Sequence, residues 1–174
     1  NRAQKGDPIL QPGRADGGKS KRDVVAKLER YVPLKARGTN RVDAALAVLL
    51  EDVSYFGFSE PLQMLWPPRS SEPPLGRKVF KLGRTTGLTE GKVTAFEVDG
   101  LIVEYETGTY IFDGQLEIEP TGFSPFSLGG DSGALIVDEE GEVVGLLFAG
   151  NDADTTYANP IEEVLKEFKA TLQI

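Results

Sequence analysis

The sequence contains no histidine and no cysteine among its 174 residues. The lack of cysteine excludes disulfide bonds, thiolate metal sites and a cysteine nucleophile. The lack of histidine removes the side chain that most often serves as a general base near neutral pH. No apolar run approaches the length of a membrane span, and the first residues do not have the pattern of a signal peptide.

Charge is unevenly distributed along the chain. Residues 1–41 hold 11 Lys or Arg against 4 Asp or Glu, although the whole chain has a formal net charge of −8. The remainder is therefore strongly acidic, which argues against nucleic acid as a partner. The basic stretch is interleaved with Gly, Pro and Asp, and we interpret it as a solvated loop region. The alternative is that it contacts the acidic remainder or a missing piece of the protein.

The first part of the chain predicts short strands separated by turns. A strand is expected at residues 7–11, and a second at residues 24–34, although the apolar spacing of the second also fits a helix face. Residues 42–53 are apolar. The propensity of Ala and Leu favours a helix there, whereas the context favours a buried strand.

From Lys78 onward the pattern is that of a β-protein. Asp99-Gly100 and Asp113-Gly114 predict two-residue hairpin turns, and residues 138–141 predict a further hairpin. Short strands joined by tight turns indicate a barrel or a sandwich. The expected strands are residues 78–82, 91–98, 101–105, 109–112, 115–118, 134–137 and 143–148.

The end of the chain has a helical pattern instead. Asn159 can cap a helix whose first residue is Pro160. A helix is therefore expected at about residues 160–172. Its apolar face would consist of Ile161, Val164, Leu165 and Phe168.

A serine stands between glycines in the segment Gly130-Asp131-Ser132-Gly133. Such a serine can present its hydroxyl unshielded, and glycine lets backbone N–H groups turn toward a reacting oxygen. On its own the motif is also a common β-turn, because its residue types all favour turns. A nucleophile elbow is disfavoured, since an elbow needs a helix after the serine and a hairpin is expected here.

Two further segments precede this loop at informative positions. Residues 41–47 read Arg-Val-Asp-Ala-Ala-Leu-Ala, and residues 82–93 begin Leu-Gly-Arg-Thr-Thr-Gly. With the serine loop and the C-terminal helix, they resemble the chymotrypsin/trypsin-like serine protease family, in particular its bacterial, disulfide-free members. The first is similar to the segment with the family's catalytic aspartate, and the second to the opening hairpin of its second barrel. The resemblance spans residues 41–172 in the family's order.

This resemblance implies an all-β fold, a chymotrypsin-like double β-barrel with a C-terminal α-helix. Residues 1–60 would be a remnant of the first barrel that includes the aspartate segment. Residues 61–76, rich in proline, would connect it to a complete second barrel at residues 77–158, and residues 159–174 would hold the helix. The resemblance implies no cofactor and no metal, a polypeptide substrate, and neither a nucleic-acid nor a membrane partner.

Catalytic roles follow from the resemblance. Ser132 would attack the peptide carbonyl, and the N–H groups of Gly130 and Ser132 would bind the oxyanion. Asp43 would orient a histidine. Asp131 has no freshly cut N-terminus as a partner, so a local hydrogen bond or Arg84 would take that place.

The family order puts the histidine before Asp43, where the chain has none. We therefore expect residues that are not present in this chain to supply it, either from a front end before Asn1 or from a second chain. The alternative base is a lysine, Lys78, Lys81 or Lys92, but the alternating strand pattern there is typical of lysines that face solvent.

Substrate contacts are implied at two places. Phe148, Ala149 and Gly150 would pair with the substrate backbone as an added strand. Phe126 stands where a trypsin-type enzyme carries an acid, so the primary pocket is expected to be apolar or shallow.

The sequence thus predicts a serine endopeptidase that is inactive as this chain alone. The alternative is a catalytically inactive protease-like module that binds peptides or a partner protein. The lack of cysteine favours an intracellular, cytoplasmic setting.

Overall fold

The structure is a computed structural model that describes residues 3–54, 75–151 and 154–172. The chain divides into two units, the first comprising Asn1–Pro33 and Ala44–Phe56, and the second Leu34–Asp43 and Gly57–Ile174. The second unit holds both Asp43 and Ser132, so the candidate site can be described within one unit. No helix in the described part of the chain is long and apolar enough to cross a membrane.

The first unit is a three-stranded antiparallel sheet with the order β1-β2-β4. The strands are β1 (Pro8–Leu10), β2 (Val24–Tyr31) and β4 (Ala45–Leu49), and a 3₁₀ turn, Arg14–Asp16, follows β1. The two strands predicted near residues 7–11 and 24–34 are therefore confirmed.

The apolar segment 42–53 contains a strand rather than a helix, but the expectation that this strand is buried is wrong, since Val48 and Leu49 are exposed. Its residues Ala45–Leu49 pair along β2, from Tyr31↔Ala45 to Ala26↔Leu49. The cross-strand partner overrides the helical propensity of Ala and Leu, because the backbone groups on the edge that faces β2 gain their hydrogen bonds from β2 instead of from their own segment.

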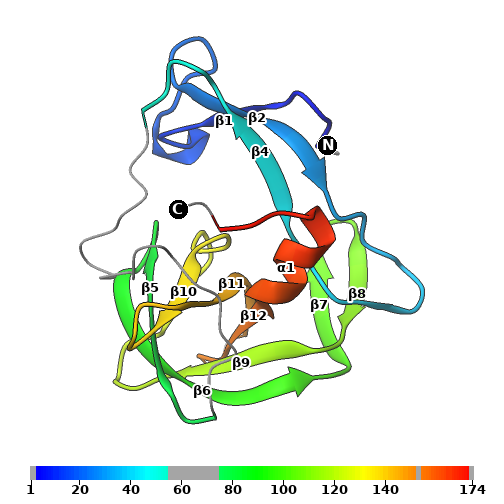
Figure 1. Ribbon diagram of the computed structural model, residues 1–174, viewed down its shortest axis with the longest axis vertical. Coiled ribbons are helices and arrows are strands. Elements are labelled where there is room, and N and C mark those ends of the chain that lie inside the picture. The colour runs from blue at the N-terminus through cyan, green and yellow to red at the C-terminus, as the bar shows by residue number, and fades with distance from the viewer. Residues whose placement is uncertain (1–2, 55–74, 152–153, 173–174) are drawn as a thin grey trace. The chain divides into compact units, whose positions relative to one another are not determined.

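The second unit contains a closed six-stranded barrel with the order β10-β11-β12-β9-β6-β5 (Figure 1). Its interior is filled by side chains that alternate along the strands, among them Val79, Val93 and Ile118, which are fully buried. The strands are β5 (Lys78–Gly83), β6 (Gly87–Val98), β9 (Gln115–Pro120), β10 (Leu135–Asp138), β11 (Val143–Gly150) and β12 (Thr156–Pro160).

A long two-stranded ribbon extends from this barrel. Strands β7 (Leu101–Tyr105) and β8 (Gly108–Phe112) form an antiparallel hairpin with its tip at Glu106-Thr107. A short strand, β3 (Thr39–Asn40), pairs in parallel with β8. The ribbon thereby holds the residues that lead up to Asp43.

The two-residue hairpins predicted at Asp99-Gly100 and Asp113-Gly114 are wrong. Strand β6 pairs with β9, and β7 pairs with β8. The two dipeptides therefore lie opposite each other at one bend, where β6 continues into β7 and β8 continues into β9. Each aspartate accepts a hydrogen bond across the bend, Asp99 from the Gly114 N–H and Asp113 from the Gly100 N–H. Both glycines have φ of +71°, and this conformation serves a bend as well as a hairpin turn.

The C-terminal helix is shorter than predicted. Helix α1 covers Ile161–Phe168 and packs on β11 and β12, with Ile161, Val164 and Phe168 buried (Figure 1). Asn159 does not cap it, because the N-cap residue is Pro160 and no side chain caps the helix. The amide of Asn159 bonds elsewhere, as described below. The predicted apolar face is otherwise confirmed, apart from Leu165, which is half-buried.

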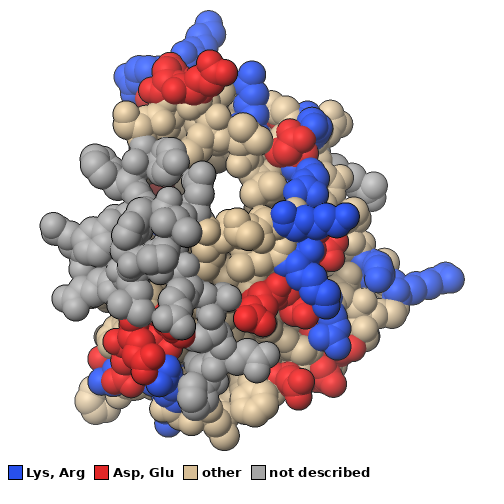
Figure 2. Space-filling view, viewed as in Figure 1, with Lys and Arg blue, Asp and Glu red and all other residues tan. Residues whose placement is uncertain are grey.

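Charges of opposite sign lie close together within the basic N-terminal stretch. Lys5 pairs with Glu29, and Arg22 pairs with Asp23 at 2.8 Å, all within the first unit. Figure 2 shows acidic side chains beside basic ones at several places on the face that it draws. The interpretation of the whole stretch as a solvated loop region is wrong in part, since it contains β1, β2 and β3 and buries Ala26, Leu28 and Asn40.

The predicted fold class is confirmed in outline, since the described residues form β-sheets with one C-terminal helix. The division at residues 60, 76 and 158 stays a prediction. Most of the proline-rich connector, residues 61–74, lies outside the described residues.

Replacing Ile118 by Ala should destabilise the barrel, because Ile118 is fully buried in its core. We expect a loss of about 2–5 kcal/mol in the free energy of unfolding, measured by urea titration. The matched control is Ile102→Ala on β7, whose side chain is 65% exposed, and its effect should stay within about 0.5 kcal/mol. Equal losses for the two variants would contradict the core described here.

Candidate active site

The serine loop is a tight turn that leads into β10. Gly130 and Gly133 have φ of +102° and +89°, which L side chains rarely adopt. A Cβ atom at Gly130 would also lie 2.5 Å from the Thr85 hydroxyl oxygen. The loop therefore requires glycine on both sides of Asp131-Ser132. Because β10 and not a helix follows Ser132, the nucleophile elbow is excluded.

Ser132 is exposed at the end of this turn. Its Oγ lies 3.5 Å from the carbonyl oxygen of Phe148, which is at the long limit for a hydrogen bond. In the turns and loops that the structure describes, the N–H groups of Gly130 and Ser132 donate to no backbone carbonyl. Within the described residues, no backbone carbonyl of a turn or loop therefore occupies these two N–H groups.

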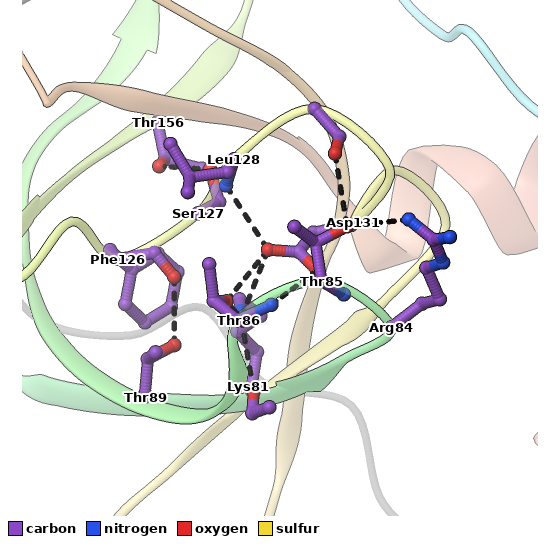
Figure 3. Close-up of polar contacts among 12 residues, drawn as sticks. Lys81, Arg84, Thr85, Thr86, Thr89, Phe126, Ser127, Leu128, Asp131 and Thr156 are labelled. Atoms are coloured by element: carbon purple, nitrogen blue, oxygen red, sulfur yellow. Dashed lines mark hydrogen bonds and ion pairs between the residues drawn. The ribbon is translucent and has the colours of Figure 1, made fainter.

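The adjacent Asp131 is buried and anchors the loop to the β5–β6 turn (Figure 3). One carboxylate oxygen accepts hydrogen bonds from the N–H groups of Thr85 at 2.7 Å and Thr86 at 3.2 Å. The other accepts from the Thr86 hydroxyl at 2.7 Å and the Leu128 N–H at 3.1 Å. Burial raises the pKa of Asp131, but these hydrogen bonds outweigh it and lower the pKa to about 2. Asp131 is therefore ionised at neutral pH.

Lys81 completes the environment of this carboxylate. Its side chain is fully buried, and its Nζ lies 3.4 Å from an Asp131 oxygen. The ammonium also donates to the Thr86 hydroxyl and to the Gly87 carbonyl, and it lies 5.8 Å from the centre of the Phe126 ring. Burial lowers the pKa of Lys81, and the charge of Asp131 opposes that shift.

The expectation that Lys81 faces solvent is wrong. It shares one face of β5 with Val79, which lies in the barrel core, so the period of the strand carries the lysine inward. The predicted local hydrogen bond of Asp131 is present, since the Thr85, Thr86 and Leu128 donors all bind its carboxylate. The buried cation beside this carboxylate is Lys81, and Arg84 donates to the Thr85 hydroxyl at 3.4 Å.

The close fit of this cluster depends on Gly83. A Cβ atom there would lie 2.4 Å from a carboxylate oxygen of Asp131 and 3.0 Å from the Lys81 Nζ. Any side chain at this position would push the carboxylate away from its donors.

Two residues of the second unit bind Asp43, Asn159 at its backbone and Tyr105 at its carboxylate. Its N–H donates to the Asn159 side-chain oxygen at 2.9 Å, and its carbonyl accepts from the Asn159 amide at 3.1 Å. Its carboxylate Oδ2 accepts a hydrogen bond from the Tyr105 hydroxyl at 2.6 Å. This explains why Asn159 does not cap α1.

Strand β11 contacts both Ser132 and Asn159, the residue that binds the backbone of Asp43. The Asn159 amide also donates to the Leu146 carbonyl on β11, at 3.3 Å. Two residues further along this strand, Phe148 receives the Ser132 hydroxyl. Ser132 therefore contacts β11 directly, whereas Asp43 reaches the same strand through Asn159.

The predicted substrate-contact residues differ in their surroundings. Phe126 is fully buried in the barrel core, and its carbonyl accepts a hydrogen bond from the Thr89 hydroxyl at 2.7 Å. Residues Ala149 and Gly150 pair with β12 on one side. Among the described strands, none pairs with the opposite edge of this stretch. The roles of these residues in substrate binding stay predictions.

Sequence reasoning missed Tyr105, the burial of Lys81 beside Asp131 and the role of Asn159. For Lys81 a signal was present, since Val79 and Lys81 share a face of one strand. No local pattern distinguishes Tyr105, whose partner lies 62 residues away. Asn159 stood at a helix start, where a capping role was the simpler interpretation.

The sequence matches no protein-family model and no curated protein. The structure is similar to solved bacterial proteases. It superposes on Cellulomonas bogoriensis chymotrypsin with a TM-score of 0.62 and 19% identity, covering 90% of this chain and 80% of that one. It matches a glutamic acid specific serine protease with a TM-score of 0.62 and 21% identity, over 89% and 77% of the two chains. It matches the alpha-lytic protease homolog N4 with a TM-score of 0.60 and 26% identity, again over 89% and 77%.

Replacing Lys81 by Met should destabilise the protein, because it leaves the Asp131 charge buried without its cation. We expect a loss of about 3 kcal/mol in the free energy of unfolding, measured by urea titration. Lys92→Met is the matched control, since Lys92 is 49% exposed and pairs with Glu119 only at 4.0 Å. A similar, small effect of both variants would show that Lys81 does not compensate a buried charge.

Stability should also depend on pH through Asp131. Its pKa of about 2 lies below the ordinary value of 3.8, so the unfolded chain binds more protons between these two values. Its contribution is complete above about pH 4 and is lost as the pH falls to 2. The destabilisation by Asp131→Asn should thus be about 2 kcal/mol larger at pH 5 than at pH 2. Urea titrations at both pH values measure it, and a pH-independent difference would contradict the assignment.

Proposed function

We propose that this chain, which has the fold of bacterial chymotrypsin-like serine proteases, is a serine endopeptidase whose catalytic histidine is supplied by residues not present in it. The observation that supports this most strongly is the exposed Ser132 on a turn that the buried Asp131 anchors. An anchored turn keeps the nucleophile in one position, and such positioning contributes much of the rate of acyl transfer.

In the proposed reaction the substrate is a polypeptide. The histidine takes the proton of the Ser132 hydroxyl while Oγ attacks the scissile carbonyl carbon. The negative charge moves to the carbonyl oxygen, where the N–H groups of Gly130 and Ser132 stabilise it. The histidine then gives its proton to the leaving amine, and an acyl-Ser132 ester remains. Water hydrolyses this ester by the same steps and restores the serine.

Asp43 serves as the group that orients the histidine. A buried or half-buried carboxylate beside the imidazole fixes its tautomer and stabilises the imidazolium that forms. The bonds of Asp43 to Asn159 and Tyr105 hold its backbone and its carboxylate, as this role requires.

The contacts of the lysines argue against a lysine base. Lys81 is buried between Asp131 and Thr86, which keeps its ammonium occupied. Lys78 and Lys92 are exposed and pair with Glu90 and Glu119. A histidine from outside this chain therefore remains the preferred base.

The substrate backbone would bind along residues Phe148, Ala149 and Gly150 as an added strand. The edge of this stretch that β12 does not occupy has no strand partner among the described residues. An extended peptide there would gain main-chain hydrogen bonds next to Ser132. Phe126 would support the floor of the primary substrate pocket without contacting the substrate, since its side chain is fully buried in the barrel core.

The alternative function is a catalytically inactive module of the same fold that binds peptides or a partner protein. The absence of histidine is the observation that favours it. The two functions differ in one respect that can be measured, since only the endopeptidase forms a covalent bond between Ser132 and an acylating substrate.

The experiment compares the full-length protein with the 174-residue chain, after their intact masses are verified. We expect the full-length protein to cleave a peptide library and to bind a serine-reactive phosphonate at Ser132. The 174-residue chain should be slower by roughly 10⁶-fold, since this is what loss of the catalytic histidine costs in serine proteases. Ser132→Ala should abolish cleavage and labelling in the full-length protein.

The matched control is Ser20→Ala, an exposed serine of the first unit, which should leave both signals unchanged. Robust cleavage by the 174-residue chain that Ser132→Ala removes would show that no outside histidine is needed. Absence of cleavage and labelling in both forms would refute the endopeptidase and favour the binding module.

A further inference from the structure

The carboxylate of Asp43 has one side-chain donor among the described residues, and that donor comes from a distant strand. The Tyr105 hydroxyl, at the end of β7, donates to Oδ2 at 2.6 Å. No described residue donates to Oδ1. Among the described residues, the carboxylate thus has one oxygen with a donor and one without.

Aromatic contacts fix the position of Tyr105. Its ring packs edge-on against Tyr110 with 5.5 Å between ring centres, and lies 6.5 Å from the ring of Phe112. Phe112 is fully buried and packs against Phe148 with 4.9 Å between ring centres. The Phe148 carbonyl in turn accepts from the Ser132 hydroxyl. Ring contacts through Phe112 and Phe148 therefore link Tyr105 to the residue that Ser132 contacts.

Tyr105 also remains a hydrogen-bond donor under ordinary conditions. Burial raises the pKa of its phenol, and the hydrogen bond to Asp43 and the negative charge of that carboxylate raise it further. The hydroxyl therefore keeps its proton where a carboxylate needs a donor.

We propose that Tyr105 is a positioning residue of the active site, whose hydroxyl holds the Asp43 carboxylate so that its other oxygen faces the catalytic histidine. This inference rests on the proposed endopeptidase function. Two rotatable bonds separate the Asp43 carboxylate from the backbone, which Asn159 already holds. The Tyr105 hydrogen bond restrains this remaining freedom. A carboxylate free to rotate would orient the imidazole only part of the time.

The test is peptide cleavage by the full-length protein with Tyr105→Phe. Because the histidine and aspartate act on the transition state, we expect kcat to fall about tenfold with KM unchanged. Tyr110→Phe is the matched control, since among the described residues its hydroxyl bonds to the exposed Thr107, at 3.1 Å, and not to Asp43. Its kcat should stay within about twofold. In an Asp43→Asn background, Tyr105→Phe should have no further effect on kcat.

A second variant keeps the test valid if Tyr105→Phe does not fold. Incorporation of 4-fluorophenylalanine at position 105 fills the space of the hydroxyl but donates no hydrogen bond, and it should lower kcat equally. Equal kcat values for Tyr105→Phe and Tyr110→Phe, or a further loss in the Asp43→Asn background, would overturn the role of Tyr105 and leave the endopeptidase intact. Absence of Ser132-dependent cleavage in the unmodified protein would refute the proposed function, and this inference with it.

Discussion

The ionised carboxylate of Asp131 is the group on which the candidate site depends. A buried charge is costly unless donors surround it, and here two backbone N–H groups of the β5–β6 turn, the Thr86 hydroxyl, the Leu128 N–H and the Lys81 ammonium do so. Most of these donors belong to a different strand pair from Asp131. The carboxylate therefore ties the loop that carries Ser132 to the turn between β5 and β6, and β5 is the strand that pairs with β10. Gly83 and Gly130 leave room for this contact, because a side chain at either would collide with it.

Strand β11 is the element that residues near Asp43 and Ser132 both contact. On its one side the strand pairs with β12, and Asn159 of β12 reaches across to hold the backbone of Asp43. On its other side the Phe148 carbonyl lies beside Ser132. The β7–β8 ribbon adds Tyr105 and Phe112 to the same region. Three separate parts of the chain thus converge on one strand, and each carries a residue with a place in the proposed mechanism.

Some of these features could be predicted from single segments. The glycine-flanked Ser132, the hairpin that follows it and the apolar face of α1 each depend on residues a few positions apart, so their patterns survive in the sequence. The Asp99-Gly100 and Asp113-Gly114 turns show the limit of that reasoning. Asp-Gly marks a change of direction correctly, but the pairing of the flanking strands decides between a hairpin and a bend.

The β-character of the chain, the serine loop with its glycines and the lack of histidine within these residues can all be seen in the sequence. The fold is needed to show that Lys81 is buried, that Asn159 binds the backbone of Asp43 instead of capping α1, and that the Tyr105 hydroxyl binds Asp43. The last two contacts join residues 116 and 62 positions apart. Hydrogen bonds and ion pairs act over a few ångströms, and no local pattern records which distant residue the closing of a barrel will bring within that range.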